Sequence, residues 1–377
     1  MENKNIYVKL KSFLFNFNND DYIYLIIFSI ILGILVSICT FLFRLCFETL
    51  QIIFYGVSLD STSIQLQNIP WYITLLVPTF GGLVIGILIY KFMPNKRPTG
   101  IADLMTINSK LKSNYSIILA TKGALINSLS LGIGASVGSV GPIVHIGGTI
   151  GYFFSSKLKL NSDFMTIMIA CGVASAISTL FNAPIAGVIF ALEIIVKKYN
   201  IETFVPILLS SAVSTIISRL YFGPLTTFNI PQLEFNSFME LPLFIILGTL
   251  CSVIAIIFIK LIFSCENFYN RRNIPIWTRP GIGGFVVGLI AIFVPEILGV
   301  GYFGTNLALS SSIPLWFCIV LIIGKTGATG ICLGSRFGGG VFIPSIFIGA
   351  MLGSCFGIIA NIYFPDSASS IGFYTLI

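Results

Sequence analysis

The sequence predicts an all-α integral membrane protein built from helices of uneven length, many of them tilted or re-entrant. Charged residues make up 9% of the 377 residues and the mean hydropathy is +0.97, whereas an ordinary soluble domain carries about 25% charged residues. Long uncharged stretches recur along the chain, and roughly 20 apolar residues are enough to cross the hydrocarbon core. These stretches cover residues 22–43, 61–90, 123–156, 164–192, 241–259, 297–324 and 337–365. Several of them are long enough for one crossing plus a re-entrant piece.

The first elements are a short N-terminal arm over residues 1–21 and long helices at about residues 22–54 and 72–93. The first apolar stretch follows Asp20 and Asp21 and lacks a small-residue cleavage site. We therefore interpret it as a retained helix and not as a cleaved signal peptide.

The distribution of basic residues predicts the orientation in a cell membrane. Basic residues gather in the N-terminal arm and in alternate connections, which the positive-inside rule assigns to the cytoplasm together with the N-terminus. They are Lys4, Lys9, Lys11, Lys91, Lys96, Arg97, Lys110, Lys112, Lys197, Lys198, Arg271, Arg272 and Arg279. The connections around Asp60, Glu240 and Glu296 contain no Lys or Arg, as expected of the opposite face.

Composition also excludes several function classes. The net charge of +7 comes without the basic stripe of a nucleic-acid binder, so we expect no nucleic-acid partner. One histidine, no carboxylate cluster and eight cysteines without paired spacing leave little material for metal or hydrolytic chemistry. We expect no enzyme, no metal and no cofactor, and we interpret the cysteines as packing residues.

After residue 93 glycine and proline interrupt the apolar pattern in two similar segments. The chain reads GALINSLSLGIGASVGSVGPIVHIGGTIG over residues 123–151 and GKTGATGICLGSRFGGGVFIPSIFIGAMLG over residues 324–353. Each segment follows or begins with a basic residue, contains a glycine-rich break, and then has a proline where a new helix would begin, at Pro142 and Pro344. Similar broken segments in corresponding halves indicate an inverted-repeat channel or transporter with a site near the midplane.

A helix that begins inside the membrane exposes unpaired backbone N–H groups and the positive end of its dipole, which together attract an anion. Glycine allows the backbone to approach the ion without an intervening side chain. Partial charges of this kind also release the ion readily, as conduction requires. Glycine can alternatively serve close helix packing, and for isolated glycines such as Gly33 we favour that interpretation.

Four breaks have the form expected of such a site. They read RPTGI at residues 97–101, GSVGP at 138–142, FNAP at 181–184 and GGVFIP at 339–344. Their order and separations resemble those of the voltage-gated chloride channel family, the ClC chloride channels and transporters, and the resemblance extends over nearly all of the chain from about residue 22. It implies a ClC-like bundle of two inverted repeats, the first over residues 22–221 and the second, incomplete, over 222–377.

The resemblance also implies the anion-binding groups. Thr99 stands where the family usually has a serine whose hydroxyl binds the central chloride, and threonine keeps that hydroxyl. A threonine bonded to its own backbone in a turn is the alternative interpretation. We expect chloride at hydroxyl and backbone donors of Thr99, Gly100, Ile101, Val140, Gly141, Val341 and Phe342, and we assign no role to His145.

Two positions depart from the family pattern. Most members have a glutamate at the position of Val140, where the carboxylate gates the outer site and carries protons, and valine cannot ionise. Family antiporters use a second, inner glutamate, and the ungapped motif places Ile194 there. The neighbouring Glu193 would point about 100° away on a helix, so we interpret it as a structural ion pair or a solvated carboxylate.

With both proton-handling positions apolar, the sequence predicts a passive channel for chloride or a similar small anion. The alternatives are a proton-coupled chloride antiporter with another proton route, and a transporter for an organic anion. The chain ends at Ile377, where the family pattern would begin another helix and later supply a chloride-binding tyrosine and part of a homodimer interface. A truncated inactive fragment is therefore a further alternative, and homodimerisation is expected from the family alone.

Overall fold

The computed structural model describes residues 21–60, 63–109, 117–197, 200–223, 227–228, 230, 240–365 and 368–377. Within these residues every element is helical, apart from an isolated antiparallel β-bridge between Gly138 and Gly340. The all-α prediction is therefore confirmed. The predicted N-terminal arm lies outside the described residues except for Asp21.

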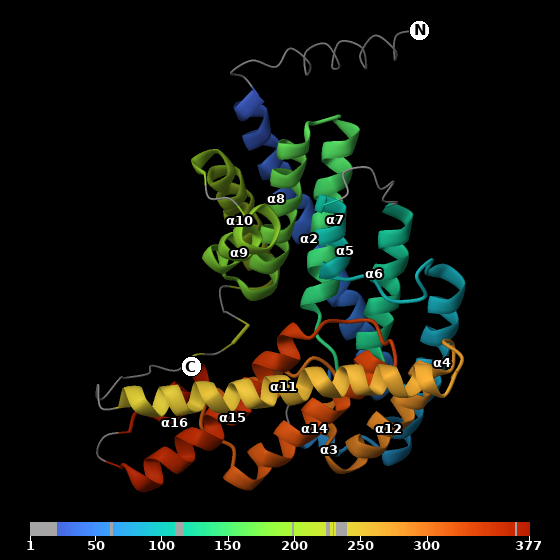
Figure 1. The fold of residues 1–377 in the computed structure, drawn as a ribbon, viewed down its shortest axis with the longest axis vertical. Coiled ribbons are helices and arrows are strands. Elements are labelled where there is room, and N and C mark those ends of the chain that lie inside the picture. Colours follow the sequence, from blue (N-terminus) through green and yellow to red (C-terminus); the bar gives the residue numbers. More distant parts are fainter. Residues whose placement is uncertain are drawn as a thin grey trace.

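Most of the first half of the chain forms the upper part of the molecule in the view of Figure 1. Its helices are α2 (Asp21–Tyr55), α3 (Ser63–Gln67), α4 (Trp71–Phe92), α5 (Ile101–Ser109), α6 (Ile117–Gly132), α7 (Val140–Lys157), α8 (Ser162–Phe181), α9 (Pro184–Ala191) and α10 (Ile201–Phe222). A π-helical segment, Leu192–Val196, continues α9. Helices α2 and α4 confirm the two long helices predicted at about 22–54 and 72–93.

The second half lies below, where α11 crosses the view while α7 and α8 run along its long axis (Figure 1). Its helices are α11 (Leu241–Arg271), α12 (Arg279–Phe293), α13 (Tyr302–Leu309), α14 (Leu315–Gly334), α15 (Phe342–Tyr363) and α16 (Ile371–Leu376). Seven described helices, α2, α4, α8, α10, α11, α14 and α15, are long and apolar enough to cross a membrane. The predicted repeat boundary falls at the end of α10, and the division into inverted repeats stays a prediction.

Helices α4 and α12 pack against each other although they belong to different halves of the chain. Their close approach depends on small residues, since a methyl group at Gly86 would overlap the Trp277 carbonyl oxygen, and one at Gly284 would overlap the Pro78 carbonyl oxygen. Small residues allow helix backbones to approach closely in membranes, where dispersion contacts replace the hydrophobic effect between helices.

A seam of buried serines joins α8 to α10. Ser175 and Ser210 hydroxyls lie 2.7 Å apart, and those of Ser178 and Ser211 lie 2.6 Å apart. Hydroxyl pairs of this kind hold membrane helices together because each hydroxyl provides the other with a hydrogen-bond partner in place of water. The seam fixes the end of α8, which borders the site described below.

The non-helical backbone between α12 and α13 is satisfied by a buried lysine. Lys325 of α14 is fully buried, and its ammonium donates to the carbonyl oxygens of Ile297 at 3.0 Å and Gly299 at 2.8 Å. Gly299 in turn donates its N–H to the Gly134 carbonyl at 3.1 Å. Irregular backbone is tolerated at membrane depth only where such partners exist. Lys325 therefore anchors the loop before α13, and Gly299 joins that loop to the one after α6.

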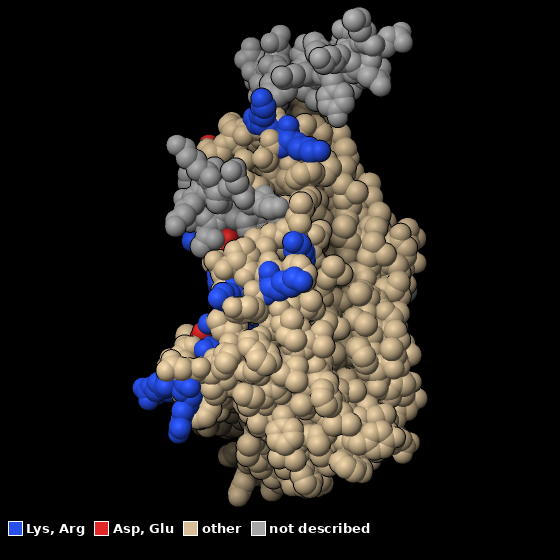
Figure 2. All heavy atoms as spheres, turned by 90° about the vertical axis from the view of Figure 1, so that its right-hand side faces the viewer, with Lys and Arg blue, Asp and Glu red and all other residues tan. Residues whose placement is uncertain are grey.

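The surface has the uneven charge distribution expected of a protein in lipid. Lys and Arg side chains lie along one edge of the face in Figure 2, and most of the remaining area carries no charged side chain. Exposed apolar residues on α11 include Ile245 and Phe263, which are 70% and 59% exposed. Large exposed apolar areas of this kind mark a lipid-facing or partner-facing surface.

The α4–α12 contact generates a stability prediction. Gly86→Ala should lower the free energy of unfolding by about 1–3 kcal/mol, because the added methyl forces two packed backbones apart. Gly248→Ala is the matched control, since nothing lies within 4 Å of a methyl at that helical position. Thermal unfolding in detergent should show a lower midpoint for Gly86→Ala only. Equal midpoints for the two variants would contradict the packing argument.

Candidate functional site

The first glycine-proline break places the N-terminus of α7 inside the protein. Ser139 is the N-cap, the helix begins at Val140, and its first turn is closed by the Ile143 N–H bonded to the Ser139 carbonyl at 3.2 Å. The N–H groups of Val140 and Gly141 therefore have no acceptor within the helix, and Pro142 has no N–H to leave unsatisfied. The result is a buried, positively polarised helix end.

The second break repeats this arrangement at α15. Val341 is the N-cap, the helix begins at Phe342, and the Ser345 N–H closes the turn on the Val341 carbonyl at 3.0 Å. Pro344 again occupies the third helical position, as Pro142 does in α7. The two helix ends are thus equivalent residue by residue, with Val140 corresponding to Phe342.

A pair of backbone hydrogen bonds brings the two helix ends together. Gly138 donates to the Gly340 carbonyl at 2.7 Å, and Gly340 donates to the Gly138 carbonyl at 2.8 Å. Gly339, the residue before Gly340, has φ of +155°, and a methyl group there would overlap the Val137 side chain. Glycine is required at this position both for its conformation and for space. The site residues predicted on α7 and α15 are therefore close together.

The third predicted segment precedes α5 and is linked to α15 through Asn127. The Thr99 hydroxyl is buried and has no hydrogen-bond partner among the described residues. Asn127 of α6 donates its amide to the Thr99 carbonyl at 3.3 Å, and a methyl at Gly338 would overlap its Oδ1 atom. Asn127 thus contacts both Thr99 and the loop that leads into α15.

One predicted anion donor in this segment is already occupied. The Gly100 N–H donates to Asp103 at 2.9 Å, and Asp103 also accepts from Arg97 at 2.7 Å. Asp103 caps the first turn of α5, so the Gly100 amide donates to a carboxylate within the protein, and its role in chloride binding stays a prediction. The free hydroxyl of Thr99 and the amide of Ile101 remain as candidate donors.

The two positions that depart from the family pattern are apolar and packed. Val140 is fully buried in the core cluster, and Ile194 packs against the same cluster. Glu193 lies in the π-helical segment with an exposed side chain. Glu193 forms no ion pair among the described residues. The directions of neighbouring side chains differ between a π-helix and an α-helix. In this π-helical segment the Ile194 side chain packs against the core and the Glu193 side chain is exposed.

Aromatic rings surround the α15 helix end. The Phe342 ring lies 6.2 Å from that of Phe181 and 6.3 Å from that of Phe190, between centroids. Phe228 continues the cluster, 6.1 Å from Phe181 and 5.9 Å from Tyr302. Val341 and Phe342 are 47% and 38% exposed, so the α15 end is open whereas the α7 end is enclosed.

Tyr302 is a site residue that the sequence analysis missed. Its phenol oxygen lies 3.2 Å from the hydroxyl of Ser139, the residue just before Val140. The sequence did contain a signal, namely the two glycines just before Tyr302. In the structure Gly299 and Gly301 have φ of +64° and +99° and turn the chain into α13. The separation of 163 residues hid the contact itself.

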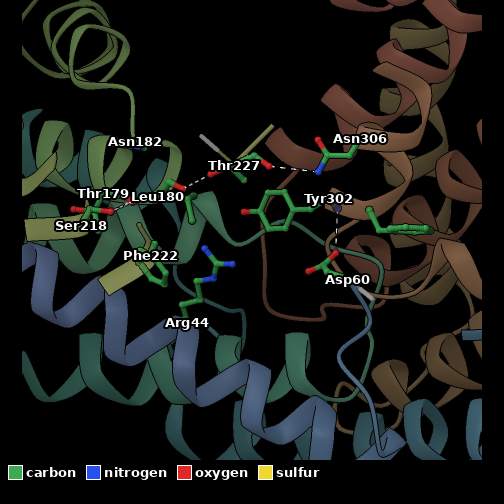
Figure 3. A pocket seen from close by; sticks show the side chains of 11 residues that line it. Arg44, Asp60, Thr179, Leu180, Asn182, Ser218, Phe222, Thr227, Tyr302 and Asn306 are labelled. Carbon is green, nitrogen blue, oxygen red and sulfur yellow. Dashed lines mark hydrogen bonds between the residues drawn. The ribbon is translucent and has the colours of Figure 1, made fainter. Parts of the chain in front are cut away.

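Tyr302 also borders a cavity of about 290 Å³ (Figure 3), and its contact with Ser139 connects this cavity to the start of α7. The cavity is formed by the C-terminal ends of α8 and α10, the second half of α2 and the start of α13. Its lining residues are Arg44, Asp60, Thr179, Leu180, Asn182, Ser218, Phe222, Thr227, Tyr302, Phe303 and Asn306.

Comparison with known proteins identifies relatives along most of the chain. The family model described as "Voltage gated chloride channel" matches residues 81–377. A ClcB-like protein of Ralstonia nicotianae is 30% identical over 346 residues, with 90% of this chain and 80% of the relative covered. The H(+)/Cl(−) exchange transporter ClcA of Vibrio cholerae is 26% identical over 317 residues, covering 81% of this chain and 67% of the transporter.

A solved structure has the same fold. The crystal structure of a slow cyanobacterial Cl−/H+ antiporter superposes with a TM-score of 0.77 at 22% identity, covering 91% of this chain and 81% of that one. Some relatives are much longer. The chain spans 39% and 48% of the Arabidopsis thaliana chloride channel proteins CLC-f and CLC-e.

The position of Thr99 generates a prediction about anion binding. Gly123→Ala should weaken anion binding at Thr99 by roughly tenfold, because the added methyl overlaps the Thr99 hydroxyl and displaces it. Gly327→Ala is the control, since nothing lies within 4 Å of a methyl there. Calorimetric titration of the purified variants with bromide measures the change. Wild-type affinity in Gly123→Ala would mean that Thr99 does not contact the anion.

Proposed function

Because this chain belongs to the voltage-gated chloride channel (ClC) family, we propose that it carries chloride or a similar small anion passively across the bilayer. The observation that supports this most directly is the pair of helix N-termini joined through Gly138 and Gly340, with valine where a carboxylate would gate the α7 end. We further propose that the chain acts without a cofactor, is not an enzyme, functions as a homodimer and has a cytoplasmic N-terminus.

The anion would be held by dipoles and not by a buried cation. The first-turn amides of α7 and α15 and the hydroxyl of Thr99 each contribute a partial positive charge. Donors of this kind replace hydration water without binding the ion so strongly that it cannot leave. The open α15 end would admit the anion from one side, and the amides of Val140 and Gly141 would receive it on the other.

Passive movement follows from the chemistry of Val140 and Ile194. Neither side chain can ionise, and both are packed into the apolar core. An antiporter must bind and release a proton in each cycle, so it needs a titratable group at the anion path. Glu193, whose side chain is exposed and not packed in this core, does not supply one there.

A proton-coupled antiporter is the second candidate, because the Vibrio cholerae relative is named an H(+)/Cl(−) exchange transporter. That function would need a proton route different from the two glutamate positions. The partly buried carboxylate of Asp60 accepts the backbone N–H of Tyr302 at 3.1 Å, and the Tyr302 phenol lies 3.2 Å from the Ser139 hydroxyl. Asp60 is therefore a titratable group close to the start of α7. Asp60→Asn should abolish proton movement if this route exists.

The two candidates are separated by measuring chloride efflux and proton uptake together in liposomes that contain the purified protein. We expect rapid chloride efflux without proton uptake. Proton uptake in a fixed ratio to chloride efflux would refute passive transport and favour the antiporter.

Val140→Glu tests the role of the gate position. The new carboxylate should compete with chloride for the α7 amides and slow efflux by at least about tenfold at neutral pH. Lowering the pH should restore efflux as the carboxylate becomes protonated. Val140→Gln is the control, because glutamine has nearly the shape of glutamate but no charge. Efflux through the Val140→Gln variant should not depend on pH in this way. Equal rates for wild type and Val140→Glu would place the anion path elsewhere.

A further inference from the structure

The cavity beside Tyr302 has one cationic side chain directed into it. Figure 3 shows the Arg44 guanidinium, from α2, pointing into the space between Phe222 and Tyr302. Its Nε donates to Glu48 at 2.6 Å, and the Phe222 ring covers it at 4.5 Å from the centroid. An arginine has five N–H donors, and in the described part of the chain only the Nε is bonded to a side chain. The terminal N–H groups are therefore available to a ligand.

A second, independent observation points to a ligand in the same cavity. Thr179, near the end of α8, is 1% exposed, and its hydroxyl has no hydrogen-bond partner among the described residues. Its carbonyl accepts the Ser218 hydroxyl at 2.8 Å, so the backbone here is satisfied and only the hydroxyl is not. A buried hydroxyl without a partner is costly, and Thr179 lines the cavity. A bound acceptor would relieve that cost.

The acidic groups around the cavity oppose an anion less than their number suggests. Glu48 is held by Arg44, and the Asp60 carboxylate accepts the Tyr302 N–H at 3.1 Å. Burial raises the pKa of Asp60, while Lys325 and the Tyr302 N–H act in the opposite direction. The charge of Asp60 is therefore partly countered at its own end of the cavity.

From Arg44 and Thr179 we infer that this cavity is a separate anion-binding site, holding a partly hydrated chloride-sized anion before or after it occupies the α7 helix end. The volume of about 290 Å³ has room for one such ion and several waters, which take about 30 Å³ each in the liquid. Tyr302 connects the two places, because it lines the cavity and its phenol meets Ser139. The role in transport rests on the proposed function, whereas the binding itself does not.

The test measures bromide binding to the purified full chain by broadening of the bromine NMR signal, beside anion current in cells. Arg44→Gln should weaken bromide binding at the cavity five- to tenfold, since it removes a charged hydrogen-bond donor. Thr179→Val, which keeps the shape and removes the hydroxyl, should weaken it less, about threefold. Both should raise the chloride concentration needed for half-maximal current from the cavity side.

Glu48→Gln is the control for a purely structural role of Arg44. It breaks the same ion pair but leaves the guanidinium in place, so bromide binding should not weaken. A loss in Glu48→Gln as large as in Arg44→Gln would overturn the inference. Bromide binding unchanged in both Arg44→Gln and Thr179→Val would also overturn it, even where the protein carries chloride current. Conversely, bromide binding that depends on Arg44 in a protein without current would support this site and refute the proposed function.

Discussion

The two hydrogen bonds between Gly138 and Gly340 are the interaction on which the rest of the site depends. They join loops about 200 residues apart in sequence and direct the starts of α7 and α15 toward a common space. In lipid a broken helix leaves polar backbone groups whose desolvation is costly. Mutual pairing at Gly138 and Gly340 removes that cost for these two residues, while the first-turn amides of both helices have no acceptor within their helix. The glycines are therefore structural as well as a means of exposing the amides.

The same constraint explains the buried polar residues around the site. Gln51 donates to the Leu131 carbonyl at 3.2 Å, and Tyr55 donates to the Ile133 carbonyl at 2.7 Å, so α2 satisfies the end of α6. Lys325 does the same for the loop before α13. At the far end, Glu240 accepts the Tyr374 phenol at 2.7 Å and thereby ties α16 to the start of α11. These four side chains each bond near a place where a helix begins or ends.

The sequence predicted what depends on local chemistry. Pro142 and Pro344 mark helix starts because proline fits a first turn and few other places, and both were located correctly. Contacts between distant segments could not be predicted in this way. The Tyr302 contact with Ser139 and the Arg44 cavity depend on how four helices meet, and the bond from the Gly100 amide to Asp103 was not foreseen. Composition carries no information about which of several acceptors a donor will choose.

Valine at position 140 removes a negative charge that most members of the family have at the start of α7. In the proposed function, a carboxylate at Val140 would repel an approaching anion and compete for the α7 amides, and valine would remove both effects. Selectivity against cations must then come from elsewhere, because helix dipoles fall off within about one turn. Arg44 lines the cavity that Tyr302 borders, and Lys325 is buried behind the loop before α13. Their fields act beyond the first turn of a helix because buried charges are screened less than exposed ones. In the proposed function, the charge of Arg44 would attract the anion, and the helix dipoles would hold it weakly enough to pass.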